Sequence, residues 1–487
     1  MQIQTPEWVK HAVFYQIFPD RFAARPLLPP FSLAPLSLEA WQSEPTLQGY
    51  KGGNLWGVID QLDYIQSLGV TAIYFTPIFQ SPCNHRYHTH DYYQIDPLLG
   101  GNEAFFQLLH AAHSRGMKVV LDGVFNHVGR GFFFFNDILE NGPHSPWVDW
   151  FKIEGWPLAP YDGDRPANYV SWCGNRALPE FNHANPAVRE YIMRVAEHWI
   201  RCGIDGWRLD VPFCITEPGF WQEFRRRVKA INPNAYIVGE VWHDARRWLD
   251  GTQFDGVLNY LFAGATIAFA AGDRVDPEQV QDRDYEPYPG IDALTYAEKI
   301  QLLLHAYPWE IQLTQLNVLA SHDTARLLTM THGDIDTVKL ATLLLITFPG
   351  APSIYYGDEV GLPGGLDPDS RRSFPDPEQW NQELLDCHRK LIALRHARLS
   401  LRIGEYRFLG ADNQTYAFAR IFEGDVLIIA VNAADHFGKI DLEEAGTRLG
   451  AQPSYLLYST SDEATEIVWT ADNLFLAIPP RTGIVLS

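Results

Sequence analysis

The sequence predicts an α/β protein: a (β/α)8 TIM barrel with a small subdomain inserted after its third strand and a C-terminal all-β sandwich domain. Three observations favour this fold. Short apolar runs alternate with helical patterns over most of the 487 residues, and eight strands in such alternation are the number that closes a barrel. Between Val124 and Ala187 the alternation stops for about sixty residues, too long for a structureless loop in a compact domain. After Ala397 only short alternating runs follow, as in a sandwich.

The elements follow from these patterns in order. Candidate strands are Ala12–Phe18, Ala72–Ile78, Lys118–Val124, Gly206–Val211, Ala235–Val241, Gly256–Phe262, Leu316–Ser321 and Ser353–Tyr356. Candidate helices are Val58–Leu68, Asn102–Arg115, Ala187–Cys202, Phe220–Ile231, Tyr296–Tyr307, Thr337–Thr347 and Glu383–His396, several of them followed by glycine. A doubly wound open sheet is the alternative, but its usual glycine-rich phosphate turn is missing after the first strand.

These elements predict a division of the chain. We expect the barrel at 1–125 and 187–397, the inserted subdomain at 126–186 and the sandwich at 398–487. The aromatic run Phe132–Phe135 indicates a buried cluster in the insertion, although one or two rings could line a groove. Candidate sandwich strands are Thr415–Ile421, Val426–Asn432, Ser454–Tyr458 and Leu474–Ile478. The one low-complexity stretch is the proline-rich loop Pro26–Pro35.

Composition excludes several classes of function. The 38 basic and 59 acidic residues give a net charge of −21, which repels nucleic acid and anionic membrane surfaces. The N-terminus lacks a basic and an apolar region, and the longest apolar run, Leu340–Phe348, is too short to span a membrane, so we expect a soluble cytoplasmic protein. The five scattered cysteines predict neither a disulfide framework nor a metal knuckle.

Polar residues close four of the predicted strands. They are Asp122 and His127, Arg208 and Asp210, Glu240 and Trp242, and His322 and Asp323. The active site of a β/α barrel lies at the carboxyl ends of its strands, so these side chains should share one opening. A single Asp after a strand usually caps the next helix, and a lone His is usually structural. Four such strand ends are different, because burying several carboxylates together is costly unless function requires them.

Cleavage of a glycosidic bond needs such a set of acids. A retaining enzyme uses one carboxylate as nucleophile and one carboxylic acid to protonate the leaving oxygen, about 5–5.5 Å apart. Arg208 is placed to keep Asp210 ionised, which suits a nucleophile. Glu240 would then have the raised pKa and act as acid and later as base. Asp323 could hold sugar hydroxyls and favour the positively charged transition state.

The strand ends resemble the signature regions of glycoside hydrolase family 13, the α-amylase superfamily: Asp122–His127, Gly206–Asp210, Val238–Glu240 and Ser321–Asp323. Further matches are Val13–Phe22, Gly52–Gly57 and Gly350–Glu359, so the resemblance covers nearly the whole chain. It implies that Asp210 is the nucleophile, Glu240 the acid/base and Asp323 the transition-state stabiliser.

The resemblance also implies which side chains contact the sugar. Arg208, His127 and His322 would touch it at the cleaved bond, and Asp122 would support Arg208. His85 and Tyr87 match the family's sugar-binding loop, in which the tyrosine stacks on glucose. Trp242, two residues after Glu240, is a further candidate contact. Apart from that of Trp242, each of these roles is carried over residue by residue from the matching motif.

Within the family the chain is most similar to the neopullulanase and cyclomaltodextrinase group, and in particular to cyanobacterial-type debranching enzymes. Leu178–Asn182 resembles the group's fifth region, and Asp367 and Arg371 match a loop that binds the next sugar along, although an exposed ion pair is an equal alternative. Phe213 and Cys214 replace the Lys-His pair through which many α-amylases hold calcium, so we expect no metal and no cofactor.

The leading hypothesis is a retaining α-glucan hydrolase that cleaves α-1,6 branch linkages, and some α-1,4 linkages, of glycogen-type, branched or cyclic malto-oligosaccharides. A transglycosylase would use the same site and the same intermediate, so the motifs leave it open. A non-catalytic glucan-binding protein is a remote alternative, because such proteins lose the acids that are present here. The expected partner is an α-glucan, with a homodimer as one option for assembly.

Overall fold

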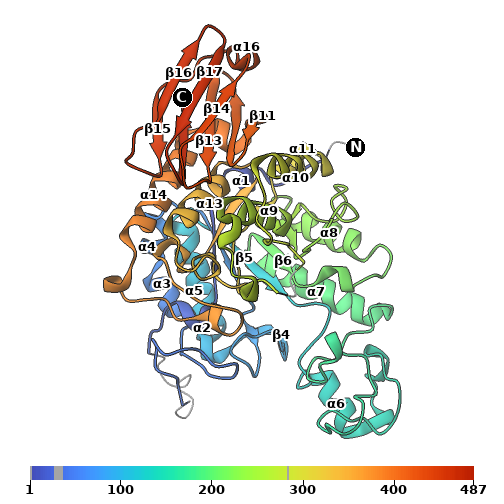
Figure 1. Ribbon diagram of the computed structural model, residues 1–487. Coiled ribbons are helices and arrows are strands. Elements are labelled where there is room, and N and C mark those ends of the chain that lie inside the picture. Colours follow the sequence, from blue (N-terminus) through green and yellow to red (C-terminus); the bar gives the residue numbers. More distant parts are fainter. Residues whose placement is uncertain (1–2, 27–36, 282–283) are drawn as a thin grey trace.

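The computed structural model describes residues 3–26, 37–281 and 284–487, and its centre is a closed barrel (Figure 1). Eight parallel strands follow the order β8-β7-β6-β5-β2-β1-β10-β9. A parallel bridge between Leu258 and Leu316 joins the two ends of this order, and the Asn259 backbone amide donates to the Leu316 carbonyl at 2.8 Å. This closure confirms the predicted TIM barrel and excludes the open sheet.

The strands of the barrel coincide with the eight predicted runs. They are β1 (Phe14–Ile17), β2 (Ala72–Phe75), β5 (Lys118–Gly123), β6 (Gly206–Leu209), β7 (Tyr236–Gly239), β8 (Gly256–Val257), β9 (Leu316–Asn317) and β10 (Ala351–Tyr355). One prediction needs correction: the run Gly256–Phe262 is a strand only to Val257, and helix α9 begins at Tyr260. The Asn259 side chain accepts from the Phe262 amide and thus caps this helix.

Helices cover the outside of the barrel. The longer ones are α5 (Gly101–Ser114), α7 (Pro186–Cys202), α8 (Phe220–Ile231), α9 (Tyr260–Ala271), α10 (Ala293–Ala306), α13 (Ile335–Thr347) and α14 (Gln382–Ala397). The predicted helix Val58–Leu68 is divided at Gln61 into α3 (Leu55–Asp60) and α4 (Leu62–Ser67). The proline-rich loop Pro26–Pro35 lies, apart from Pro26, outside the described residues.

The segment between β5 and α7 projects from the barrel at the lower right of Figure 1. It contains a helix that the sequence did not predict, α6 (Phe133–Asn141). Phe132 and Phe135 are fully buried, and the Phe134 ring stacks on Trp147 with centroids 3.7 Å apart. The aromatic run is therefore mostly core, as the first interpretation held, and the boundaries 126–186 remain a prediction.

Two antiparallel sheets form the C-terminal part, at the top of Figure 1. One has the order β11-β12-β13-β18-β15 and the other β14-β17-β16. Their bounds are β11 (Glu405–Asp412), β12 (Thr415–Phe422), β13 (Asp425–Asn432), β14 (Gly438–Leu442), β15 (Leu456–Ser459), β16 (Glu466–Thr470), β17 (Asn473–Ile478) and β18 (Thr482–Leu486). Buried side chains from both sheets, such as Ile428 and Leu476, share one core, which confirms the sandwich.

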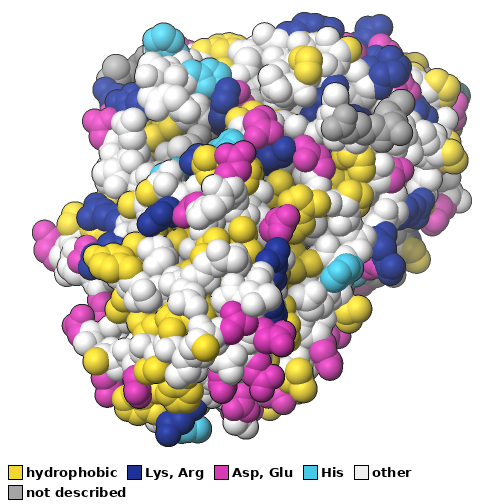
Figure 2. All heavy atoms as spheres, turned by 90° about the horizontal axis from the view of Figure 1, so that it is seen from above, with side chains coloured by type: hydrophobic (Ala, Val, Ile, Leu, Met, Phe, Trp, Pro, Cys, Tyr) yellow, Lys and Arg dark blue, Asp and Glu magenta, His cyan; other side chains and the backbone are white. Residues whose placement is uncertain are grey.

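Charged side chains of both signs lie on the surface. On the face shown in Figure 2, acidic and basic side chains are interspersed among polar and apolar ones. Among the helices of the described residues, none combines the length and the apolar character needed to cross a membrane.

Candidate active site

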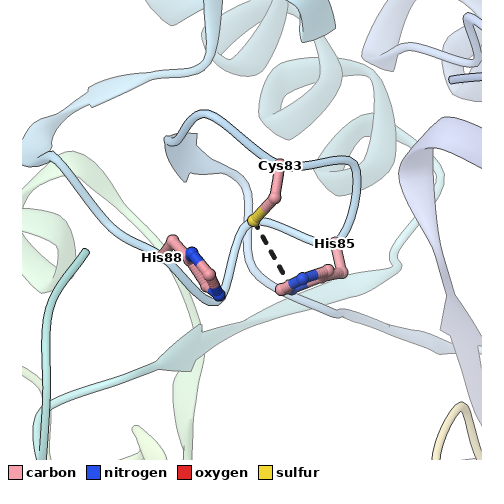
Figure 3. A group of neighbouring side chains, drawn as sticks. All are labelled: Cys83, His85 and His88. Carbon is pink, nitrogen blue, oxygen red and sulfur yellow. Dashed lines mark hydrogen bonds between the residues drawn. The ribbon is translucent and has the colours of Figure 1, made fainter. Parts of the chain in front are cut away.

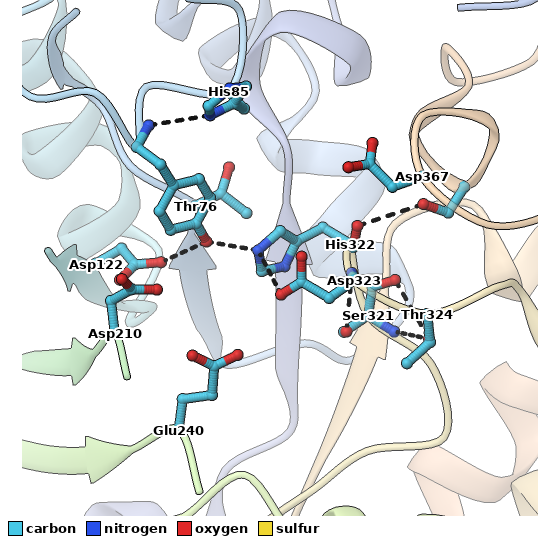
Figure 4. A network of polar contacts seen from close by, with 12 residues as sticks. Thr76, His85, Asp122, Asp210, Glu240, Ser321, His322, Asp323, Thr324 and Asp367 are labelled. Carbon is cyan, nitrogen blue, oxygen red and sulfur yellow. Dashed lines mark hydrogen bonds and ion pairs between the residues drawn. The ribbon is translucent and has the colours of Figure 1, made fainter. Parts of the chain in front are cut away.

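Three buried acids, Asp122, Asp210 and Glu240, lie near one another at the carboxyl end of the barrel (Figure 4). The buried Arg208 contacts all three. Its Nη1 donates to both oxygens of Asp122 and to Asp210 Oδ1, each at 2.9 Å. Its Nη2 forms an ion pair with Glu240 Oε1 at 2.8 Å. The acids stand at the ends of β5, β6 and β7, whose parallel register brings Asp122 beside Arg208. One guanidinium therefore gathers three carboxylates that are far apart in the sequence.

Burial raises the pKa of all three carboxyl groups, and Arg208 opposes this effect. The pKa of Asp122 rises to about 6, and that of Asp210 lies well above its ordinary range. The sequence predicted a raised pKa at Glu240 and an ionised Asp210. Burial raises the pKa of Asp122 and Asp210 as well, whereas the Arg208 guanidinium favours the ionised form of each. Burial disfavours charge on all three carboxyl groups, and the repulsion between them adds to this effect, so each holds its proton more tightly than a free carboxyl group does.

His322 and Asp323 face this cluster from the loop after β9 (Figure 4). Asp323 lies 3.1 Å from His322 Nε2 and 3.3 Å from Arg371 Nη2. Burial lowers the pKa of His322 to about 3, so the imidazole is neutral. The Gln16 amide lies 2.9 Å from His322 Nδ1, and donation from this amide leaves the ring proton on Nε2, directed toward Asp323 and Tyr87.

Tyr87 connects the two sides of the site. Its hydroxyl donates to Asp122 Oδ2 at 3.1 Å and lies 2.5 Å from His322 Nε2. Its ring lies nearly parallel to that of His322, with an interplanar angle of 5°. The backbone amide of Tyr87 donates to His85 Nδ1 at 3.2 Å, so the Nε2 atom of His85 carries its ring proton. Of the sequence-predicted pair, Tyr87 therefore contacts the acid cluster directly, and His85 is joined to it through the Tyr87 backbone amide.

Glu240 is held by two further donors. Its Oε2 accepts from the Val211 backbone amide at 3.2 Å, and its Oε1 accepts from Trp242 Nε1 at 3.3 Å. The Trp242 ring stacks on Tyr260 at 3.6 Å, which fixes its orientation. Val211 has a φ of 34°, which is a costly backbone conformation for a β-branched residue. The strained residue is thus the one whose backbone amide donates to Glu240.

The remaining predicted residues lie around this centre. His127 is buried with a pKa lowered to about 3, and Trp172 from the projecting segment packs 5.2 Å from its ring. Arg371 Nη1 pairs with Asp367 at 2.9 Å, while Arg371 Nη2 reaches Asp323. Arg371 thus joins Asp367 to the site, and this ion pair is mostly buried on the arginine side.

Sequence reasoning missed three polar side chains of the site. Gln16 on β1 contacts His322, Tyr74 on β2 donates to Asp122 at 3.2 Å, and Tyr260 on α9 supports Trp242. A signal existed for Gln16, which is a buried amide in an otherwise apolar strand. Tyr74 and Tyr260 gave no such signal, because tyrosines are common in the core of a barrel.

Comparison with known proteins agrees with this geometry. Residues 16–390 match the family described as alpha amylase, catalytic domain. The chain belongs to the α-amylase family. It is a glycoside hydrolase, and this excludes a non-catalytic glucan-binding protein.

Similar proteins narrow the group. A debranching enzyme from Nostoc punctiforme has 66% sequence identity and a TM-score of 0.93, with each chain covered completely. A cyclomaltodextrinase from Geobacillus thermopakistaniensis is 41% identical over 99% of this chain and 78% of its own. Neopullulanase 2 from Thermoactinomyces vulgaris is 43% identical over 88% of this chain and 70% of its own. The predicted likeness to the neopullulanase and debranching-enzyme group is confirmed.

Proposed function

We propose that this α-amylase-family enzyme is a retaining hydrolase that cleaves α-1,6 branch linkages, and some α-1,4 linkages, of malto-oligosaccharides. The observation that carries the proposal is the pair of ion contacts at Arg208, which direct Asp210 and Glu240 to one side of the barrel opening. The similarity to a debranching enzyme, a cyclomaltodextrinase and a neopullulanase supports an α-glucan as the substrate.

In the first step Asp210 attacks the anomeric carbon while Glu240 gives its proton to the leaving oxygen. The bond between the anomeric carbon and that oxygen breaks, and a covalent ester to Asp210 forms. Glu240 begins this step protonated, which its raised pKa favours, and the hydrogen bond from Arg208 Nη1 stabilises the ionised Asp210. In the second step water attacks the same carbon, Glu240 takes its proton, and the ester breaks with overall retention.

Other side chains would bind and orient the sugar. Asp323 would accept hydrogen bonds from sugar hydroxyls and offset the positive charge of the transition state. His322 and His85, both neutral, would donate through Nε2. Tyr87 would offer its ring, and Asp367 with Arg371 would contact the next sugar along. The domain boundaries predicted from the sequence, with the barrel at 1–125 and 187–397, the insertion at 126–186 and the sandwich at 398–487, are also part of this proposal.

A pair of substrates tests the linkage preference. The purified protein is incubated with a branched and a linear malto-oligosaccharide of equal size, and the products are identified by chromatography and mass spectrometry. Faster cleavage of the branched sugar, with release of the linear side chain, is the expected result. Exclusive cleavage of the linear sugar would contradict the α-1,6 preference.

A mechanism-based label tests the covalent step. An activated, fluorinated maltosyl substrate slows hydrolysis of the intermediate, so the glycosyl group should accumulate on the peptide that contains Asp210. Peptide mass spectrometry identifies the modified residue. A label on another acid, or none while activity is lost, would contradict the assignment of Asp210.

Replacing Glu240 by Gln removes the proton that the leaving oxygen needs. We expect kcat to fall by about 10²–10⁴-fold, while glucan binding stays measurable by calorimetry. The matched control is Glu463→Gln, which alters an exposed acid in the C-terminal part and should leave kcat unchanged. Nearly normal turnover of Glu240→Gln would mean that another group supplies the proton.

The covalent ester to Asp210 could also pass its glycosyl group to a second sugar instead of to water, so transglycosylation is a second candidate function. The Trp242 ring, stacked on Tyr260 beside Glu240, offers a flat apolar surface on which an acceptor sugar can lie. Adding glucose or maltose as acceptor should then yield products longer than the donor fragment. Trp242→Ala should lower the ratio of transfer to hydrolysis, measured by product analysis.

A further inference from the structure

One cysteine and two histidines meet in the loop between β3 (Phe79–Gln80) and β4 (Asp91–Ile95), which follows barrel strand β2 (Figure 3). Cys83, His85 and His88 each present one ligand atom, and these atoms lie within 4.8 Å of one another. Cys83 Sγ lies 3.5 Å from His85 Nδ1. All three residues are partly exposed, so a dissolved ion can reach them. Among the described residues (3–26, 37–281 and 284–487), this is the one group of three His, Cys, Asp or Glu side chains whose ligand atoms lie this close together.

We propose that Cys83, His85 and His88 bind a divalent cation that prefers sulfur and nitrogen ligands, best represented by Zn²⁺, and that the bound ion inhibits glucan cleavage. The fit is geometric. Tetrahedral zinc with bonds of about 2.3 Å to sulfur and 2.0–2.1 Å to nitrogen separates its ligand atoms by about 3.3–3.6 Å. Cys83 and His85 already have this separation, and the His88 ring has to move by at most about 1.5 Å.

The donor set selects the metal. A thiolate and two imidazoles suit zinc and similar soft or borderline ions, whereas calcium and magnesium need oxygen ligands, which none of these three side chains provides. Three protein ligands leave the fourth zinc position to water.

The link to catalysis runs through His85. A zinc ion on His85 Nδ1 would occupy the lone pair that now accepts a hydrogen bond from the Tyr87 backbone amide. The Tyr87 hydroxyl in turn donates a hydrogen bond to Asp122 in the acid cluster. One thiolate and two neutral imidazoles leave the zinc site with a charge of about +1. That charge would stand beside a sugar that becomes positive in the transition state and would therefore raise the barrier. The inhibition rests on the proposed function, whereas the binding does not.

Zinc titration of the full chain tests both parts. Calorimetry with ZnCl₂ in a phosphine reductant, which does not compete for zinc as a dithiol does, gives stoichiometry and affinity. Cobalt(II) replaces zinc to report a thiolate ligand by its near-ultraviolet charge-transfer band. The variants are Cys83→Ser and His88→Ala, and the control is Cys202→Ser, which alters a cysteine that lies 3.7 Å from His198 on α7.

We expect one zinc per chain, an affinity at least about tenfold weaker in Cys83→Ser and in His88→Ala, and no change in Cys202→Ser. The cobalt–thiolate band should vanish in Cys83→Ser. Saturating zinc should lower the kcat/KM of the unsubstituted protein about tenfold, and each variant is compared with itself with and without zinc.

Zinc affinity that neither substitution changes would overturn the site, even if activity falls. Zinc bound at the site with an unaltered kcat/KM would overturn the inhibition. A chain that cleaves no glucan even without zinc would instead contradict the proposed function, and calorimetry would still decide the binding.

Discussion

Arg208 is the residue on which the geometry of the acid cluster depends most. Its fully buried guanidinium contacts Asp122, Asp210 and Glu240, which come from three neighbouring strands. The planar, five-donor guanidinium can meet several carboxylates at once, whereas a lysine ammonium acts as a single point charge. Removing one member of such a buried set leaves the others with uncompensated charge.

Replacing Arg208 by Lys should therefore damage the site although the charge is kept. We expect kcat/KM to fall at least about 100-fold and the free energy of unfolding to fall by about 2–4 kcal/mol, since Lys cannot meet all three carboxylates. Steady-state kinetics and chemical denaturation measure the two effects. The control Arg194→Lys alters an exposed arginine paired with Glu190 and should change neither quantity. Full activity of Arg208→Lys would refute this account of the cluster.

Some features of individual site residues could be predicted from the sequence, and others could not. Asp122, Arg208 and Asp210 could be placed together because each follows or ends a predicted parallel strand. The pKa of Asp210 could not be predicted, because it depends on how many carboxylates share Arg208 in space. The role of Gln16 in orienting His322 was likewise hidden, since it depends on a contact between residues 306 positions apart.

At the scale of elements, periodicity predicted the barrel strands better than the places where helices begin. Strand runs were recognisable because buried parallel strands are continuously apolar. Helix α9 was missed for the same reason: it is apolar on nearly every side, so its sequence has no 3.6-residue period. The cap at Asn259 was the available signal.

Glu359 connects three elements near the end of β10. It lies in a short 3-10 helix (Asp358–Val360), and its Oε1 accepts from Tyr15 on β1 and Tyr64 on α4, each at 2.7 Å. The Gly357 amide donates to its Oε2 at 2.9 Å. Burial raises the pKa of Glu359 from 4.5 to about 7, although these donors oppose the rise. The folded protein therefore holds a proton here that the unfolded chain releases at lower pH.

This proton makes stability depend on pH. Because the folded pKa is raised, the stabilisation is complete below pH 4.5 and is lost as pH rises to about 7. Glu359→Gln cannot release a proton, so the free energy of unfolding should change by about 3 kcal/mol less between pH 4.5 and 7.5 than in the unsubstituted protein. Urea unfolding across this range measures the change. Glu383→Gln, at an exposed acid on α14, should keep the full pH dependence. Identical pH profiles for Glu359→Gln and the unsubstituted protein would contradict the linkage.

At the scale of the whole molecule, two buried arginines lie where the barrel meets the C-terminal part of the chain. Arg420 on β12 donates to the carbonyls of Thr347 at 2.6 Å and Gly404 at 3.0 Å. Arg395 on α14 donates to the Gly350 carbonyl at 2.5 Å, before β10, and to the Leu401 carbonyl at 2.9 Å, in the segment that leads to β11. Within the described part of the chain, no carboxylate pairs with either guanidinium, and burial lowers the pKa of Arg395 to about 9. Backbone carbonyls thus stabilise two cations in the junction between the two parts.

Arg420→Met tests how much this junction contributes. Methionine fills a similar length with apolar atoms, but it leaves the Thr347 and Gly404 carbonyls without their donor, which should lower the free energy of unfolding by about 2–4 kcal/mol. The catalytic acids lie at the strand ends of the barrel, so kcat/KM at low temperature should stay unchanged. Calorimetry measures the stability loss, and Arg389→Met, at a partly exposed arginine of α14, is the control. Unchanged stability would mean that relief of the buried charge offsets the lost hydrogen bonds, and the junction would then depend on apolar packing alone.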